Sequence, residues 1–328
     1  MPFSWLTTSR PIVALAPMAG VTDAAFRCLV KRMVPEVLVF TEFVSTNALT
    51  MGSERTLRML AFDPEIERPL IVQVFGADPK KFLDACRIIE QLGADAIDIN
   101  MGCPAAKIVS SCYGSALIKK PELAAELVHA AVRAVSIPVS VKTRLGWDTP
   151  ETLIPFCTKL VEAGASALAV HGRLYRDKFS GTADWEPMYA LKRAVNVPVI
   201  GNGDITSASD ALAKLKNLDG VMIGRAAIGN PWLLRAIVDA VRAPSGGRVV
   251  DGGMKQELTF SEKMPLILEH CRLAVKSKGE RRGIIEMRKH FGHYISGFNG
   301  AKELRMKLMT LESLEEVKIA LTGDQHCS

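Results

Sequence analysis

The segment of this chain best suited to chemistry contains a cysteine: Asp98-Ile99-Asn100-Met101-Gly102-Cys103-Pro104. The apolar run from Ala94 to Ile99 predicts a buried strand, and a polar asparagine ends it. Cys103 follows a glycine and precedes a proline, so its thiol would lie at the carboxyl end of that strand. Barrels and doubly wound α/β sheets carry their active sites at this end. A reactive thiol is one interpretation, and a small, buried, inert cysteine is the other.

Charged and amide side chains end other apolar runs. A lysine at the position of Lys142 could stabilise the negative charge at the N1/O2 edge of a reduced flavin, or it could form a Schiff base. Gln73 could both donate to and accept from the polar edge of the same ring. We favour the flavin because it also explains two glycine-rich segments further along the chain.

These two segments, Gly201-Asn202-Gly203-Asp204 and Ile223-Gly224-Arg225, follow the last two apolar runs. They expose backbone N–H groups without side-chain bulk, and in many barrels a phosphate lies between the loops at these positions. Glycines that only form tight turns are the alternative. Because Arg225 adds a counter-charge, the segments together favour a phosphorylated cofactor.

Eight short apolar runs would position these residues, and a segment with helical spacing follows most of them. The expected strands are 12–16, 37–41, 70–75, 96–100, 139–143, 167–171, 197–201 and 220–224. The expected helices are 24–33, 79–92, 121–135, 152–163, 185–195, 208–214 and 231–241. This alternation predicts an α/β fold, a (β/α)8 TIM barrel. A doubly wound sheet is the competing fold, but no G-x-G-x-x-G motif follows the first strand.

The character of the chain changes after the last of these helices. We expect a catalytic barrel domain at 1–241 and a C-terminal helical domain at 242–328. Within the second domain we expect a linker at 243–248, a loop at 249–253, a helix at 260–293 and further helix at 302–321. This domain holds 15 Lys and Arg against 11 Asp and Glu, so +4 of the net charge of +6 lies there. A basic run is usually a solvated helix face, but this one also admits an acidic partner.

Composition narrows the class of protein. The 328 residues are 48% hydrophobic, enough for a large core. No apolar stretch reaches the ~18 residues of a membrane helix, and residues 1–5 do not resemble a signal peptide. Seven cysteines without a C-x-x-C pair argue against a disulfide framework and against a metal site. We expect a cytoplasmic, monomeric protein without metal and without a membrane anchor.

Many segments, read together, resemble the tRNA-dihydrouridine synthases, most closely their B-type bacterial members. The resemblance follows the family's order over nearly the whole chain. It rests on APMAGVTD (16–23), TEF (41–43), VQVFG around Gln73, INMGCPAAK (99–107), GSAL (114–117), VKTRLGWD (141–148), VHGR (170–173), SGTADW (180–185), GNGDI (201–205), GRAAIGNPW (224–232) and EMRKHFGHY (286–294).

The resemblance implies an FMN-dependent enzyme that reduces a uridine of tRNA to 5,6-dihydrouridine, with NADPH, or NADH, recharging the flavin. Hydride would pass from flavin N5 to uracil C6, and Cys103 would be the general acid that protonates C5. A thiol with a pKa of about 8.5 is protonated at pH 7 yet acidic enough to donate. By position, the residues in contact with FMN would be Pro17, Met18, Ala19, Gln73, Lys142, His171, Asn202, Gly203, Asp204, Gly224 and Arg225.

The same resemblance implies that folded RNA is the partner. The reacting uracil must leave its stack, so recognition would rest on shape and phosphate contacts. Asn100 would help to hold the uracil. The expected RNA contacts are Lys107, Arg144, Arg173 and Arg176 near the barrel mouth and Arg288, Lys289 and His290 in the tail.

Three alternatives stay open at this point. The chain could be an FMN-dependent reductase of another RNA, such as rRNA, or of a free pyrimidine. It could also be a catalytically inactive tRNA-binding barrel. A reductase of free pyrimidines would not need the basic tail, and an inactive barrel would be colourless after purification.

Overall fold

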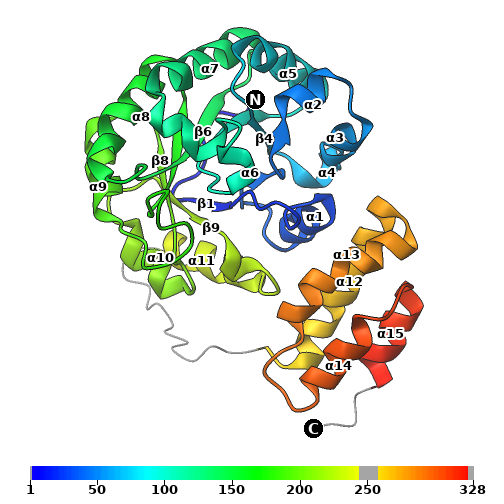
Figure 1. Ribbon diagram of the computed structural model, residues 1–328. Coiled ribbons are helices and arrows are strands. Elements are labelled where there is room, and N and C mark those ends of the chain that lie inside the picture. Colours follow the sequence, from blue (N-terminus) through cyan, green and yellow to red (C-terminus); the bar gives the residue numbers. More distant parts are fainter. Residues whose placement is uncertain (1, 244–257, 324–328) are drawn as a thin grey trace.

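The computed structural model describes residues 2–243 and 258–323. Parallel strands form a ring in the order β1-β9-β8-β7-β6-β5-β4-β2, and helices surround it (Figure 1). The ring closes between β1 and β2, because the N–H of Leu38 donates to the Val13 carbonyl (3.0 Å) and the N–H of Leu15 donates to the Leu38 carbonyl (2.9 Å). The strands are β1 (Ile12–Leu15), β2 (Val39–Phe40), β3 (Val44–Ser45), β4 (Leu70–Phe75), β5 (Ala96–Met101), β6 (Val139–Arg144), β7 (Ala167–His171), β8 (Val199–Asn202) and β9 (Gly220–Ile223). The predicted (β/α)8 barrel is confirmed.

The seven predicted barrel helices begin and end within one residue of their expected bounds. They are α1 (Ala24–Met33), α5 (Pro79–Gln91), α7 (Pro121–Ala134), α8 (Leu153–Glu162), α9 (Glu186–Ala194), α10 (Ala208–Leu215) and α11 (Trp232–Arg242). Side-chain caps fix several starts: Asp23 accepts from the N–H of Phe26, and Asp78 accepts from the N–H groups of Lys80 and Lys81. Such caps satisfy N–H groups that have no partner within the helix.

The region between β2 and β4 departs most from the prediction. Residues 37–41 contribute only the short strand β2, and β3 adds a second short pairing with β4. Three unpredicted helices follow: α2 (Thr46–Thr50), α3 (Glu54–Met59) and α4 (Pro64–Glu67). Each starts at a capping side chain, Ser45, Ser53 or Asp63, and each is too short to show a helical apolar period. The short helices α6 (Ala106–Val109) and η1 (Gly114–Lys119) were not predicted either.

Alternate residues of the strands fill the barrel interior. On β1, Ile12 and Ala14 belong to the inner cluster, whereas Val13 and Leu15 belong to the outer core under the helices. This alternation is the period of two that a strand imposes on its side chains. Trp5, which precedes β1, packs into the inner cluster and is only 2% exposed. The interior is therefore a packed core, as in other barrels, which carry their active sites at the carboxyl ends of the strands.

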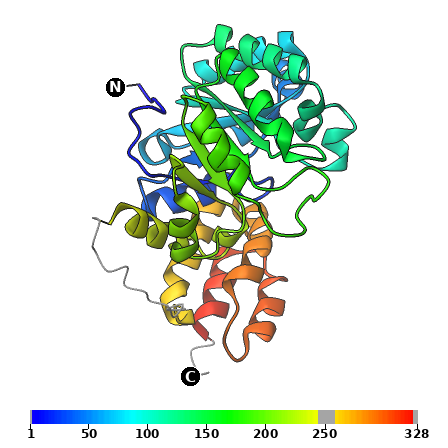
Figure 2. The same cartoon turned by 90° about the vertical axis from the view of Figure 1, so that its left-hand side faces the viewer.

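Residues 258–323 of the tail form four helices, which gather on one side of the barrel beside α1 (Figures 1 and 2). They are α12 (Phe260–Lys278), α13 (Glu280–Tyr294), α14 (Ala301–Leu308) and α15 (Leu314–Gly323). The predicted single helix at 260–293 is wrong, because the chain turns at Gly279, whose φ of +81° favours glycine. The predicted linker and loop at 243–253 lie almost wholly outside the described residues, so the domain boundary stays a prediction.

The described ranges contain no helix long and apolar enough to cross a bilayer. In those same ranges, no group of three or more His, Cys, Asp or Glu side chains could hold a metal ion. Of the two His-Cys pairs in the sequence, His270-Cys271 is buried in α12, and His326-Cys327 lies outside the described residues. That this protein needs no metal stays a prediction.

Charged groups fasten the tail to the loop after β1. The ammonium of Lys278 bonds to the carboxylates of Asp23 and Glu286, and Lys289 lies 3.7 Å from Asp23. Burial alone would raise the pKa of Asp23, but the charges of Lys278 and Lys289 outweigh it and hold this pKa well below its ordinary value. Ionised Asp23 therefore stabilises the junction between barrel and tail.

Asp23→Asn should lower the free energy of unfolding at pH 7 by about 1.5–3 kcal/mol, since it weakens a charged hydrogen bond at a nearly buried site. The stabilisation by a carboxylate of lowered pKa is complete above the ordinary value of 3.8 and is lost as the pH falls towards the folded-state value. Denaturant unfolding at pH 7 and at pH 3 should therefore show a difference between variant and parent that shrinks in acid. An equal difference at both pH values would contradict the role of the charge.

Candidate active site

Cys103 lies in a tightly held turn directly after β5. The side-chain oxygen of Asn100 accepts from the N–H of Gly102 (3.1 Å) and from the N–H of Cys103 (2.9 Å). Arg144 on β6 donates from Nε to the Gly102 carbonyl (2.7 Å). A Cβ on Gly114 would lie only 2.8 Å from the Cys103 carbonyl oxygen, so the glycine lets η1 approach the turn. The turn that carries the thiol is thus fixed at the carboxyl end of the barrel, where the sequence predicts it.

The Cys103 thiol is protonated at neutral pH. Burial raises its pKa above the ordinary value of 9.0, and the N–H of Ala105 and the charges of Arg144 and Lys142 offset only part of this rise. Activated cysteine nucleophiles have a lowered pKa instead. The environment therefore suits a thiol that gives up a proton rather than one that attacks as a thiolate.

A chain of hydrogen bonds runs through the barrel beneath this turn. Asn100 donates to the side-chain oxygen of Gln73 (2.8 Å), and the amide of Gln73 donates to Asp98 (2.6 Å). Ser140 donates to the other oxygen of Asp98 (2.7 Å). Burial raises the pKa of Asp98 to about 6, against the effect of these hydrogen bonds. This chain orients Asn100. Asp98 was not among the predicted site residues, although an acid within an apolar strand is a signal visible in the sequence.

Lys142 stands beside Asn100 in the register of β5 and β6. Its ammonium donates to Asn202 (3.1 Å), which in turn donates to the Met222 carbonyl (2.7 Å). Burial, assisted by the charge of Arg144, lowers the pKa of Lys142 to about 8, so the ammonium still predominates at pH 7. An ammonium has three donor hydrogens, and this one hydrogen bond leaves capacity for an anionic ligand.

His171 at the end of β7 carries a buried Nδ1 that has no partner among the described residues. Burial and the charge of Lys142 lower its pKa far below the ordinary value, so the ring is neutral at pH 7. A Cβ on Gly203 would lie 2.7 Å from the Cβ of Ala183 and 3.9 Å from Nε2 of His171. His171 and Gly203 thus face the same space beside the strand ends.

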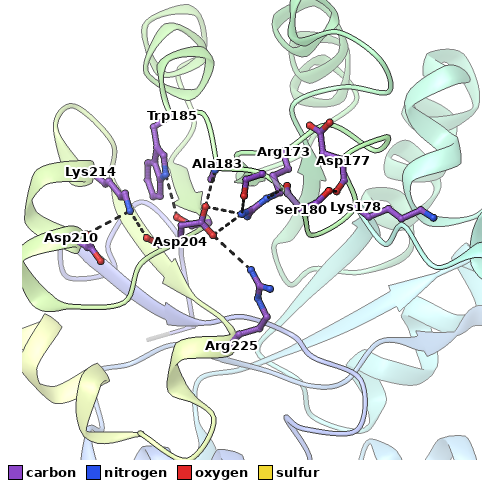
Figure 3. Close-up of polar contacts among 12 residues, drawn as sticks. Arg173, Asp177, Lys178, Ser180, Ala183, Trp185, Asp204, Asp210, Lys214 and Arg225 are labelled. Carbon is purple, nitrogen blue, oxygen red and sulfur yellow. Dashed lines mark hydrogen bonds and ion pairs between the residues drawn. The ribbon is translucent and has the colours of Figure 1, made fainter. Parts of the chain in front are cut away.

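Asp204 organises the loops after β7, β8 and β9 (Figure 3). Its carboxylate accepts from Arg173 (2.8 and 2.9 Å) and from the N–H of Ala183 (2.8 Å), and Arg225 lies 3.7 Å away. Asp204 also has a φ of +49°, a conformation that non-glycine residues rarely adopt. A carboxylate placed between two guanidinium groups positions them, and it would repel a phosphate that approached its own oxygens.

The loop after β1 completes this end of the barrel. The N–H of Met18 donates to the Thr22 hydroxyl (3.0 Å), and the Met18 sulfur would lie 3.9 Å from a Cβ on Gly224. Pro17 is half-buried and Ala19 exposed. The loops after β1 and β9 therefore meet, and Arg225 beside them keeps a side chain that is 62% exposed.

The basic residues predicted to contact RNA differ in exposure at the barrel mouth. Lys107 and Arg176 are exposed. Arg144 and Arg173 are each 3% exposed, and their guanidinium groups bond to backbone carbonyls of the segment between β7 and α9. Their geometry suits holding that segment rather than touching phosphate.

The tail residues of the prediction are mostly engaged within the protein. Arg288 donates to the Leu311 carbonyl (3.2 Å), and Lys289 faces Asp23. His290 is 1% exposed and stacks on Phe26, with ring centroids 5.3 Å apart. Lys289 is exposed, Arg288 is half-buried, and His290 is the one of these three that solvent hardly reaches.

Known proteins resemble the chain over nearly its full length. A family model described as dihydrouridine synthase (Dus) matches residues 14–327. A probable tRNA-dihydrouridine synthase of Rickettsia bellii is 39% identical over 297 residues, which cover 89% of this chain and 88% of the relative. The tRNA-dihydrouridine synthase B of Pseudomonas aeruginosa is 39% identical over 304 residues, which cover 92% and 89%. Among solved structures, morphinone reductase matches at a TM-score of 0.51 and 13% identity over 72% of this chain and 88% of its own, a likeness of fold. By the family model and by these identities, the chain belongs to the dihydrouridine synthase family.

Proposed function

We propose that this protein reduces a uridine of tRNA to 5,6-dihydrouridine, with FMN as its cofactor and NADPH as its reductant. Membership of the dihydrouridine synthase family makes the chain an oxidoreductase. The names of its relatives support tRNA as the substrate. The observation that carries the proposal is the placement of a protonated thiol, Cys103, close to the buried ammonium of Lys142 at one end of the barrel.

The residues at the strand ends fit FMN. Lys142 has donor capacity for the electron-rich edge of a reduced isoalloxazine ring, and the unpartnered Nδ1 of His171 could bond to the same cofactor. Bound FMN would supply the hydride that the uracil ring accepts. The residues that would hold it are Pro17, Met18, Ala19, Lys142, His171, Asn202, Gly203, Gly224 and Arg225. The side chains of Gln73 and Asp204 already have partners within the protein, so Gln73 would position Asn100 and Asp204 would position Arg225.

Cys103 would complete the reduction by giving its proton to C5 of the uracil. Asn100 fixes the backbone of the turn and would hold the base beside it. The thiolate that remains would be stabilised by the charges of Arg144 and Lys142 until solvent returns a proton. Because His171 is neutral and carries no proton that it loses easily, it is a poor competitor for this role.

RNA would approach the mouth along its exposed basic side chains. Lys107→Ala combined with Arg176→Ala should weaken tRNA binding, and the slope of log affinity against log salt should become shallower by about 1 for each lost phosphate contact. Arg133→Ala with Arg193→Ala is a matched control, since these exposed residues lie in the last turns of α7 and α9, away from the mouth. Equal salt slopes for parent and mouth variant would remove both residues from the RNA interface.

The absorbance of the purified protein tests the function as a whole. We expect a flavin spectrum that NADPH bleaches without oxygen and that unmodified tRNA then restores. A bleached protein that tRNA does not reoxidise, but that rRNA or free uridine does, would replace tRNA by that acceptor. A colourless protein that cannot take up FMN would favour an inactive RNA-binding barrel.

A further inference from the structure

Phe179 is a large aromatic side chain exposed at the barrel mouth. It lies in the segment between β7 and α9 and is 57% exposed. Two guanidinium groups flank its ring: Cζ of Arg144 lies 5.4 Å from the centroid and Cζ of Arg225 lies 5.7 Å from it. Single exposed apolar residues are common and need no explanation. The surroundings of Phe179 set it apart.

Buried cations hold the backbone on both sides of this ring. Arg144 donates to the carbonyl of Lys178 (2.7 Å), the residue before Phe179. Arg173 donates to the carbonyl of Ser180 (3.0 Å), the residue after it, and Figure 3 shows Arg173 reaching this segment. A flexible loop would lose entropy on binding, but a loop held in this way has lost most of it already. The ring is therefore a preformed surface.

Arg144 also connects the ring of Phe179 to the turn that carries the thiol of Cys103. Nε of Arg144 bonds to the carbonyl of Gly102, the residue before Cys103 (2.7 Å). Phe179 thus lies beside a guanidinium that also contacts the turn of Cys103. A molecule whose reacting part reached Cys103 would have its neighbouring part near Phe179.

The charge around the ring favours a nucleic acid. Arg176 and Lys178, in the same segment, are both exposed. Cationic side chains beside an exposed aromatic ring are typical of proteins that bind unpaired RNA, because the cations meet phosphates and the ring stacks on a base. The nicotinamide of the reductant is also planar, but it would have to lie against the cofactor at the strand ends rather than against a ring on the rim.

We propose that Phe179 is a stacking platform for an RNA base that neighbours the reduced uridine. The proposal rests on the proposed function, since it presumes an RNA whose uridine reaches Cys103. Stacking does not depend on base identity, because every base has a π face. The platform would hold the strand next to the extruded uridine without reading its sequence.

Phe179→Ala should weaken binding of an unmodified tRNA transcript by about 5-fold to 150-fold, the range for loss of one base stack. We expect KM for this transcript to rise by a similar factor, with a smaller change in kcat. Phe179→Tyr and Phe179→Trp should restore binding, since both keep a flat ring. Leu6→Ala, at a residue 68% exposed before β1, is the matched control and should bind like the parent.

Two results would overturn the platform. One is transcript binding by Phe179→Ala that equals that of the parent. The other is a loss confined to the rate at which NADPH reduces the flavin, which would assign the ring to the nicotinamide. Failure of the proposed function would look different: the parent protein would form no dihydrouridine. The two outcomes can be told apart because transcript binding is measured without turnover.

Discussion

Cys103→Ala should lower the rate of dihydrouridine formation by about 100-fold to 10,000-fold, the usual contribution of a general acid. The loss is expected because the variant lacks the protonated thiol of the turn whose backbone Asn100 and Arg144 hold after β5. Flavin content and the rate of flavin reduction by NADPH should stay near those of the parent, since neither requires the proton at C5. Single-turnover reoxidation by unmodified tRNA measures the affected step.

Cys112→Ala is the matched control for this variant. Cys112 follows α6 in the neighbouring loop and has Lys120 3.4 Å from its sulfur, but it lacks the Asn-x-Gly setting of Cys103. It should react at close to the parental rate. If Cys103→Ala formed dihydrouridine at the parental rate, or if Cys112→Ala were the inactive variant, the assignment of the acid would be wrong.

Glu67→Ala should lower the free energy of unfolding by about 3–5 kcal/mol, because it leaves a buried arginine without its counter-ion. Arg27 on α1 bonds to Glu67 at 2.6 Å, and both side chains are fully buried. Glu67 also accepts from the N–H of Asp63. The pair therefore joins the region of α2, α3 and α4 to α1, the helix on which α12 of the tail packs. Denaturant unfolding, followed by circular dichroism, measures the change.

Two comparison variants distinguish the loss of stability caused by breaking the buried ion pair from that caused by removing any surface charge. Glu54→Ala removes the partner of Arg58 in an exposed pair and should cost at most about 1 kcal/mol. Arg27→Met with Glu67→Leu removes both charges and should recover much of the stability lost by Glu67→Ala, as apolar replacements of buried ion pairs often do. A double variant as unstable as Glu67→Ala would show that the charges themselves are required.

Most of the barrel could be predicted from the sequence because its elements are periodic. Strands such as β4 and helices such as α5 each carry an uninterrupted pattern, with turn residues on both sides. The region of α2, α3 and α4 could not be predicted this way. Its short helices depend on single capping side chains and on the buried pair of Arg27 and Glu67, whose partners lie 40 residues apart in the chain. No local pattern reveals such a contact.

The position of the candidate residues at the strand ends was predictable from the sequence, but many of their contacts were not. Cys103, Lys142 and His171 lie at the strand ends, where the alternation of strands and helices puts them. The sequence could not show that Arg144, Arg173 and His290 are buried, because burial of a charged or polar residue depends on carbonyls and rings supplied by distant segments. The exposure of Phe179 was not predictable for the converse reason. From the sequence alone, an aromatic residue in a loop is expected to be buried in the core.

The most direct test of this account is the product itself. An unmodified tRNA transcript is incubated with the protein, FMN and NADPH, digested to nucleosides and analysed by mass spectrometry. We predict a new nucleoside heavier than uridine by two hydrogen atoms, formed by the parent and by Cys112→Ala but scarcely by Cys103→Ala. Unchanged uridine after incubation with a flavin-loaded parent that NADPH reduces would contradict tRNA uridine reduction as the function.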